Sequence, residues 1–226
     1  MTQRSRTSRA PRRQEPLDAK RPFPLIPVVI AGIVVLVLAA ILAVALAGGG
    51  GGGGTSGEPA RVPVKVTGQV LPAYPESGGS DPAVGSAIPT LDGVTFDNSS
   101  MSIGPSDGPM LVVFLAHWCP HCQAEVPRIQ DWLNSGGLPD GVKLVSVATS
   151  TSSTRPNYPP SAWLKRENWT PPVLVDDADS TALQAFGMNS FPAFVFVDGN
   201  GKVVARTTGE IAIDQLQAVV DQLARL

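Results

Sequence analysis

The sequence predicts an α/β domain over residues 85–226, with a mixed sheet flanked by helices, preceded by one transmembrane helix and a flexible linker. Three observations predict this arrangement. From residue 85 on, short apolar runs alternate with amphipathic stretches, as in sheets covered by helices. Residues 25–47 form an uncharged, largely apolar run. A stretch rich in glycine, serine and proline then separates this run from the domain.

The N-terminal residues 1–24 form a basic tail. This tail holds seven basic and two acidic residues, whereas the rest of the chain holds ten basic and seventeen acidic residues. The positive charge is thus confined to the tail, and the charge pattern predicts no nucleic-acid surface on the domain.

The apolar run over residues 25–47 predicts a membrane anchor. Its last 20 residues rise about 30 Å as a helix, which matches the hydrocarbon core of a bilayer. Because arginines precede the run, we expect a single-pass protein of the plasma membrane with a cytoplasmic tail and an extracytoplasmic domain. The alternative is a cleaved signal, since Ala45, Leu46 and Ala47 resemble a signal-peptidase site. The run is longer than the roughly 7–15 residues of such signals, which favours the uncleaved anchor.

Residues 48–84 predict a flexible linker. The stretch begins with seven glycines and remains rich in serine, proline and glycine, so it offers little apolar surface for folding. Val62, Val64 and Val66 alternate as in a strand, but Pro63 between them limits this segment to an edge strand.

The elements of the domain follow from local patterns. Residues 110–115 are continuously apolar, which is typical of a strand buried on both faces. Pro120 suits the first turn of a helix, and Val126, Ile129 and Leu133 recur at helical spacing after it. We expect strands at residues 94–96, 110–115, 142–148, 173–175, 194–197 and 202–207, and helices from residue 120 to the glycines at 136 and 137 and at residues 161–168, 181–186 and 213–223.

Cys119 and Cys122 are the only cysteines in the chain, and two residues separate them at the start of the expected helix. Two sulfurs within one turn can form and break a disulfide without unfolding the chain. An inert structural disulfide is the alternative, although so short a loop gains little from closure. Cys119 is the expected nucleophile because the helix N-terminus favours a thiolate there. Cys122, one turn inward, is expected to resolve the mixed disulfide.

The domain resembles the thioredoxin superfamily, and specifically its membrane-anchored TlpA/ResA-like branch. The polar insert between Val147 and Val173 matches the extra element of that branch. The resemblance implies a thioredoxin-like fold and a thiol–disulfide oxidoreductase that uses its own disulfide, with no other cofactor and no metal. It also implies client proteins with thiols or disulfides and a membrane redox partner. The matching residues are Trp118-Cys119-Pro120-His121-Cys122, Glu125 and Pro127 in the pattern W-C-x-x-C-x-x-E-x-P, and Ser190-Phe191-Pro192-Ala193-Phe194 in the cis-proline segment.

The resemblance also gives roles to residues around the cysteines. Pro192 is expected to be the cis-proline facing the dithiol, and the backbone of Phe191 to pair with an extended client segment. Trp118 is expected both to pack and to contact the client. Glu125 either relays protons to Cys122 or is a solvated carboxylate on the helix surface.

The two histidines of the motif carry open interpretations. His121 is expected to donate a hydrogen bond or positive charge to the Cys119 thiolate, unless it is a plain surface histidine. His117 either tunes the site or is exposed to solvent. With the cysteines, the histidines also make four soft ligands, so a copper-delivery protein is a second function class. Consecutive residues across one turn are poorly placed for a tetrahedral shell, which disfavours that class.

The expected direction of electron flow rests on one residue and one dipeptide. Thioredoxin carries a buried aspartate six residues before its first cysteine, and this chain has Val113 there. The Pro-His dipeptide between the cysteines resembles that of DsbA, the oxidising branch. We therefore favour an oxidant or exchanger, with a reductant in cytochrome c maturation as the alternative.

Overall fold

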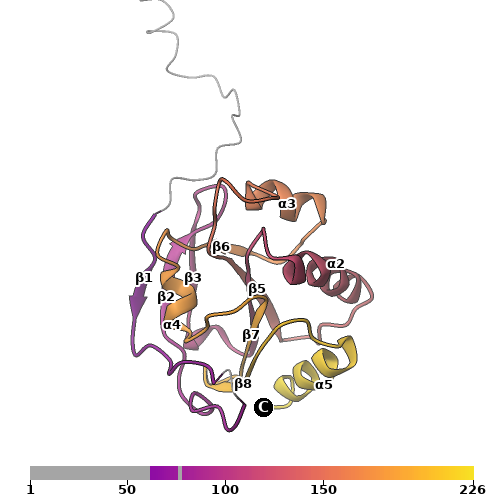
Figure 1. The fold of residues 1–226 in the computed structure, drawn as a ribbon. Helices are drawn as coiled ribbons and strands as arrows, with labels where there is room; N and C mark the ends of the chain where they lie inside the picture. Colours follow the sequence, from indigo (N-terminus) through magenta and orange to yellow (C-terminus); the bar gives the residue numbers. More distant parts are fainter. Residues whose placement is uncertain (1–61, 76–77) are drawn as a thin grey trace, which may run out of the picture. The chain divides into compact units, whose positions relative to one another are not determined.

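The structure is a computed structural model and describes residues 62–75 and 78–226 (Figure 1). The predicted basic tail, the apolar span and the first part of the linker lie outside the described residues. None of the helices in the described part of the chain is long and apolar enough to cross a membrane. The elements are β1 (Lys65–Thr67), β2 (Thr90–Val94), β3 (Ser100–Ile103), the 3-10 helix η1 (Pro105–Asp107), β4 (Met110–Leu115), α2 (Pro120–Asn134), β5 (Lys143–Ala148), α3 (Pro160–Arg166), β6 (Val173–Val175), α4 (Thr181–Ala185), β7 (Ala193–Val197), β8 (Val203–Thr208) and α5 (Ile213–Leu223).

The strands form one mixed sheet, as the sequence predicts. Its order is β1-β2-β6-β5-β4-β7-β8, and β3 pairs with β2 off this path. The central strand β4 is parallel to β5 and antiparallel to β7. Most predicted elements are confirmed within one or two residues. The strand expected at residues 94–96 instead ends at Val94, and the sequence analysis missed β3.

Strand β4 is buried on both faces and divides the interior into two clusters. Alternate side chains of a strand point to opposite faces of the sheet. Leu111, Val113 and Leu115 pack in a cluster with residues of α2, α3 and α5. The other three β4 side chains pack in a second cluster with residues of α4 and the N-terminal segment. Figure 1 shows α2 and α5 together beside the sheet and α4 near β1.

The N-terminal part of the domain begins earlier than the sequence predicts. Residues 62–75 and 78–84 are part of the fold, so the prediction of a flexible linker is wrong for these residues. Strand β1 pairs antiparallel with β2. The Leu71 N–H donates to the Ala185 carbonyl at 2.9 Å, and the Tyr74 N–H to the Gly187 carbonyl at 2.8 Å. Only a few apolar side chains, Val64, Leu71 and Ala83, enter the core here, too few to stand out among prolines and glycines.

A buried ion pair fastens this N-terminal segment to β8. The Arg206 guanidinium donates from Nε to Asp81 Oδ2 at 2.9 Å and from Nη2 to Oδ1 at 2.6 Å. Its Nη1 donates to the carbonyls of Pro72 and Phe186. The Arg206 side chain is fully buried, and its hydrogen bonds hold the pKa of Asp81 below the usual value. The pair therefore joins three segments that are distant in sequence.

Removal of one partner of this pair is expected to destabilise the fold strongly. Asp81→Ala leaves the Arg206 charge buried without its counter-ion, and breaking such pairs costs about 3–5 kcal/mol. We expect a loss of about 3 kcal/mol in the free energy of unfolding, measured by urea denaturation. Asp140→Ala, at an exposed aspartate, is the control and is expected to stay within about 0.5 kcal/mol of the parent. A similar small loss for both variants would show that the 71–83 segment contributes little to the fold.

Candidate functional site

The two cysteines lie where the central strand passes into the first long helix. Strand β4 ends at Leu115, Cys119 is the N-cap of α2, and Pro120 occupies its first turn, as the sequence predicts. Both cysteines are free thiols. Cys119 keeps 7% of its surface exposed, whereas Cys122 is fully buried. The two sulfurs therefore differ in access although they share one turn.

The more accessible sulfur lies against the proline segment before β7. Cys119 Sγ is 3.5 Å from the carbonyl oxygen of Phe191. The Phe191–Pro192 peptide bond is cis, which confirms the conformation that the resemblance implied. The backbone of residue 191 thus lies within hydrogen-bond range of the Cys119 thiol.

The inner sulfur is held in an apolar, desolvated position. The Ala116 N–H donates to Cys122 Sγ at 3.5 Å. Burial raises the pKa of the Cys122 thiol strongly, and the neighbouring Cys119 and Glu125 add to the rise, against the Ala116 N–H. Charging a sulfur here costs more than in water because the interior solvates the thiolate poorly. Cys122 therefore remains a thiol until a proton acceptor assists it.

Glu125 is a candidate for that acceptor, because its charge acts on Cys122 and its side chain is fully buried. Its Oε2 accepts from Arg128 Nη1 at 2.7 Å, and its Oε1 accepts from the Ile211 N–H at 3.1 Å. Burial raises the pKa of the Glu125 carboxyl, while the Ile211 N–H and the Arg128 charge oppose the rise. The alternative of a solvated surface carboxylate is therefore wrong. Glu125 follows Cys122 by three residues on the same helix, which places both on one side of α2.

His121 pairs with a carboxylate from another part of the chain. Its Nδ1 lies 2.8 Å from Glu210 Oε1, and its side chain is 66% exposed. This nitrogen is therefore engaged by Glu210 and does not make the hydrogen bond to Cys119 that the sequence analysis expects. The imidazole still projects from the first turn of α2, next in sequence to Pro120 and two residues after Cys119.

His117 is fully buried, whereas the sequence analysis left open whether it tunes the site or is exposed to solvent. Its Nε2 accepts from the Ser152 N–H at 3.1 Å, and its Nδ1 lies 2.7 Å from the Pro156 carbonyl. A nitrogen that accepts from an N–H carries no proton, so Nδ1 carries it and donates to Pro156. His117 thus fastens the polar insert to the end of β4 as a neutral imidazole, and the expectation of solvent exposure is wrong.

Trp118 forms an aromatic surface next to Cys119. Its Nε1 donates to the Ser150 carbonyl at 2.8 Å, and its ring meets that of Phe191 edge-on with centroids 5.7 Å apart. The Arg155 guanidinium carbon lies 4.4 Å from the Trp118 ring centroid. The sequence analysis missed Arg155, since nothing in the insert's composition predicts a cation over this ring.

The geometry gives no support to metal binding by the motif. Both ring nitrogens of His117 are engaged by the polar insert, and Nδ1 of His121 by Glu210. Within residues 62–75 and 78–226, no group of three or more His, Cys, Asp or Glu side chains gathers as a metal site would require. A copper-delivery function is therefore disfavoured by the placement of the candidate ligands.

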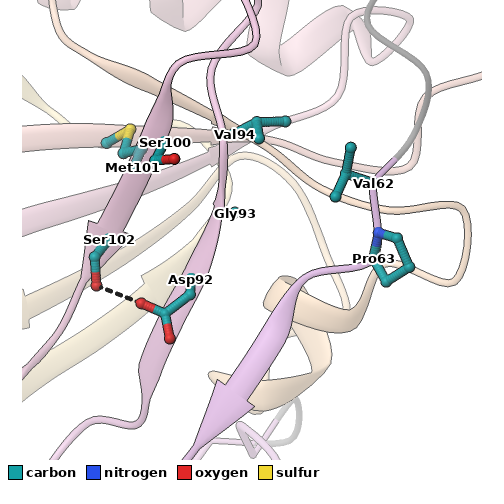
Figure 2. A pocket seen from close by; sticks show the side chains of 8 residues that line it. All are labelled: Val62, Pro63, Asp92, Gly93, Val94, Ser100, Met101 and Ser102. Atoms are coloured by element: carbon teal, nitrogen blue, oxygen red, sulfur yellow. Dashed lines mark hydrogen bonds between the residues drawn. The ribbon is translucent and has the colours of Figure 1, made fainter.

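A pocket elsewhere in the fold is separate from the dithiol. It measures about 380 Å³ and lies at β2, β3 and the residues before β1 (Figure 2). Asp92 is the one ionisable residue that lines it, and its Oδ1 accepts from Ser102 Oγ at 2.9 Å. The lining residues of the pocket are Val62, Pro63, Asp92, Gly93, Val94, Ser100, Met101 and Ser102.

Two further charged residues near the dithiol were missed by the sequence analysis. Arg128 bonds Glu125 and also lies 3.4 Å from Glu210 Oε2. The spacing of Glu125 and Arg128 is typical of a helical ion pair and offered a signal. Glu210 is 82 residues from Arg128 in sequence, and no local pattern indicates their contact.

The mixed sheet, the cysteine pair at the start of α2 and the cis-proline opposite it define a thioredoxin-like protein with a redox-active dithiol. The chain belongs to the Redoxin family, whose model matches residues 83–221. The family and the site together make it a thiol–disulfide oxidoreductase that acts on protein thiols or disulfides through its own cysteine pair.

Two solved structures with a TM-score of 0.50 agree with this fold. The thioredoxin domain of a thiol-disulfide oxidoreductase from Bacteroides vulgatus matches with a TM-score of 0.50 and 21% identity, over 62% of this chain and 96% of that one. A thiol:disulfide interchange protein of the thioredoxin family from Chlorobium tepidum matches with 0.50 and 22%, over 62% and 96%. StoA from Bacillus subtilis matches with 0.48 and 22%, over 61% and 98%. A search of curated protein sequences gave no significant match.

The unequal burial of the two thiols predicts unequal alkylation. In the reduced full chain, iodoacetamide at pH 8 is expected to modify Cys119 at least about tenfold faster than Cys122, because only a thiolate reacts and burial keeps Cys122 protonated. Mass spectrometry of peptides at short reaction times measures the two rates. The fully denatured chain is the control, in which both cysteines are expected to react alike. Equal rates in the folded protein would remove the assignment of Cys119 as the attacking sulfur.

Proposed function

We propose that the protein oxidises client proteins or exchanges their disulfides on the extracytoplasmic side of the plasma membrane, anchored by residues 25–47. Cys119 is the nucleophilic sulfur and Cys122 the resolving one. The observation that carries this proposal is their asymmetry, with Cys119 at the open N-cap of α2 and Cys122 fully buried. A dithiol with one accessible and one protected sulfur reacts with one client thiol at a time.

The oxidising cycle proceeds through one mixed disulfide. A client thiolate attacks Cys119 in the enzyme disulfide, a client–Cys119 bond forms, and Cys122 leaves as a thiolate that takes up a proton. A second client thiolate then attacks the client sulfur of the mixed disulfide. The client gains its disulfide and Cys119 leaves as a thiolate. The client loses two electrons and the enzyme gains them, so a membrane redox partner must then reoxidise the dithiol.

The first turn of α2 favours an oxidant. Unpaired N–H groups at a helix N-terminus stabilise an anion, and stabilising the Cys119 thiolate stabilises the reduced enzyme. The exposed His121 adds a potential positive charge two residues away. Val113 packs among apolar side chains in the same cluster as both cysteines, so β4 brings no carboxylate to them. These features make the disulfide readier to accept electrons.

Reduction of clients is the second candidate function, and one observation favours it. Glu125 is buried on the Cys122 side of α2 with both oxygens hydrogen-bonded. A reductive cycle needs a base that deprotonates Cys122 when it attacks the mixed disulfide, and Glu125 offers one where β4 does not. Solved relatives in the fold comparison carry the names thiol-disulfide oxidoreductase and thiol:disulfide interchange protein, which fit either direction.

The redox potential of the full chain distinguishes the two directions. Equilibration in glutathione buffers is expected to give a potential clearly above the value of about −270 mV for thioredoxin. His121→Ala is expected to lower it, because the first turn of α2 loses a potential positive charge and the Glu210 carboxylate keeps only its 3.4 Å contact with Arg128. Lys165→Ala, at an exposed lysine of α3, is the control and is expected to leave the potential unchanged. A potential at or below that of thioredoxin, insensitive to His121→Ala, would favour the reductant.

The membrane topology has its own test. With the basic tail in the cytoplasm, a protease added to spheroplasts is expected to digest residues 62–226 while the membrane stays intact. The chain is also expected to remain with the membrane fraction after a high-salt wash. Full protection of the domain from the protease would contradict the proposed orientation. Recovery of a soluble chain that begins near Gly48 would instead indicate a cleaved signal.

A further inference from the structure

Four charged or ionisable side chains form a continuous chain of contacts from the surface to the interior. His121 Nδ1 is 2.8 Å from Glu210 Oε1, and Glu210 Oε2 is 3.4 Å from Arg128 Nη1. The same Nη1 is 2.7 Å from Glu125 Oε2. Arg128 is thus shared between two carboxylates, one buried and one on the surface. Exposure falls along the way, from 66% for the His121 side chain to none for Glu125.

We propose that Arg128 and Glu210 are positioning residues that set how readily Glu125 accepts a proton from Cys122. Arg128 pairs with the Glu125 carboxylate, which follows Cys122 by three residues on α2, and Glu210 competes with Glu125 for the same guanidinium. This role rests on the proposed function, since it assumes that Cys122 is the resolving sulfur. It adds two residues to the exchange reaction, both of which act through Glu125.

The proton step balances within these groups. When Cys122 attacks Cys119 of a mixed disulfide, a bond forms between their sulfurs and the client sulfur leaves as a thiolate. The Cys122 proton passes to the Glu125 carboxylate, which becomes a carboxylic acid and later releases the proton to water. In the oxidising direction the same acid returns a proton to the departing Cys122 thiolate. A positioned acid or base of this kind contributes about 10²–10⁴-fold to a rate.

Neutral Glu125 no longer attracts Arg128, and the second carboxylate then matters. Arg128 also donates from Nη2 to the Ile211 carbonyl at 3.0 Å, which holds the guanidinium between α2 and the segment before α5. From there a small shift of Nη1 toward Glu210 keeps the cation paired. The hydrogen bond between Glu210 and His121 holds the Glu210 carboxylate in a position where it can pair with Arg128. Arg128 thereby has a partner in both protonation states of Glu125.

Arg128 and Glu210 have opposite effects on the pKa of Glu125. The Arg128 cation and the Ile211 N–H lower the pKa of Glu125, whereas the Glu210 charge raises it. Cys122 faces Glu125 from the same helix, and its own pKa is raised by the Glu125 charge. Strand β4 packs against this side of α2 with apolar side chains only. Removal of Arg128 and removal of Glu210 are therefore expected to shift the titration of Glu125 in opposite directions.

The resolving step can be measured separately with Ellman's reagent. In the reduced full chain, attack by Cys119 releases one thionitrobenzoate and leaves the other on Cys119. Attack by Cys122 then releases the second, so two phases appear in stopped-flow absorbance. Only the second phase needs the Cys122 proton to leave. The first phase is thus an internal control for damage to the fold or to access.

The pH profile of the second phase is the decisive measurement. The parent is expected to slow below the pH at which Glu125 becomes protonated. Arg128→Met is expected to move this acid limb to higher pH and Glu210→Gln to move it to lower pH. Glu125→Gln should remove the limb and slow the second phase by about 10²-fold. Arg128→Lys, which keeps the cation, should lie near the parent, and Arg225→Met and Glu167→Gln are matched controls elsewhere on the domain.

A second measurement keeps the proposal testable if a variant folds poorly. Carboxyl ¹³C NMR of glutamate-labelled full chain follows the titration of Glu125 directly, with Glu125→Gln assigning the signal. Shifts of the two variants in the same direction, or no shift in either, would overturn the proposal while leaving the exchange function intact. Absence of the second thionitrobenzoate release from the parent itself would instead contradict Cys122 as the resolving sulfur, and with it the proposed function.

Discussion

The burial of β4 on both faces is the constraint on which the rest of the structure depends. A strand covered on both sides needs other elements above and below it. The two rows of β4 side chains each pack in one of the two apolar clusters. Where such a strand ends, the chain leaves the core and the next helix begins. Cys119 and Cys122 occupy that junction, so one sulfur meets solvent and the other remains in the interior.

Desolvation then explains why polar groups around the site are so well partnered. A buried polar group without a hydrogen bond costs stability, so each must find a partner as the chain folds. His117 finds two in the insert, and Glu125 finds Arg128 and the Ile211 N–H. These bonds connect α2 to the insert and to the segment before α5. The site is therefore held by the same contacts that satisfy its buried groups.

The sequence predicted the parts of this protein that depend on local pattern. The continuous apolar run gave β4, the helical spacing of Val126 and Ile129 gave α2, and the cysteine spacing gave the dithiol. Contacts between distant residues left no such pattern. The pairing of Asp81 with Arg206 spans 125 residues, and that of His121 with Glu210 spans 89. Burial of His117 and Glu125 likewise depends on how the insert and the last loop fold over α2.

The ion pair between Asp81 and Arg206 also has a mechanical consequence if the chain is anchored by residues 25–47, as we propose. Tension on the chain at residue 62 would act first on β1, whose three residues pair with β2 alone. Once the hydrogen bonds between β1 and β2 break, the force would reach the segment from Pro72 to Asp81, which is hydrogen-bonded to the Arg206 guanidinium at both ends. The central strand and the dithiol lie beyond that point. In the proposed membrane-anchored form, the N-terminal edge of the sheet would thus yield to tension before the redox centre does.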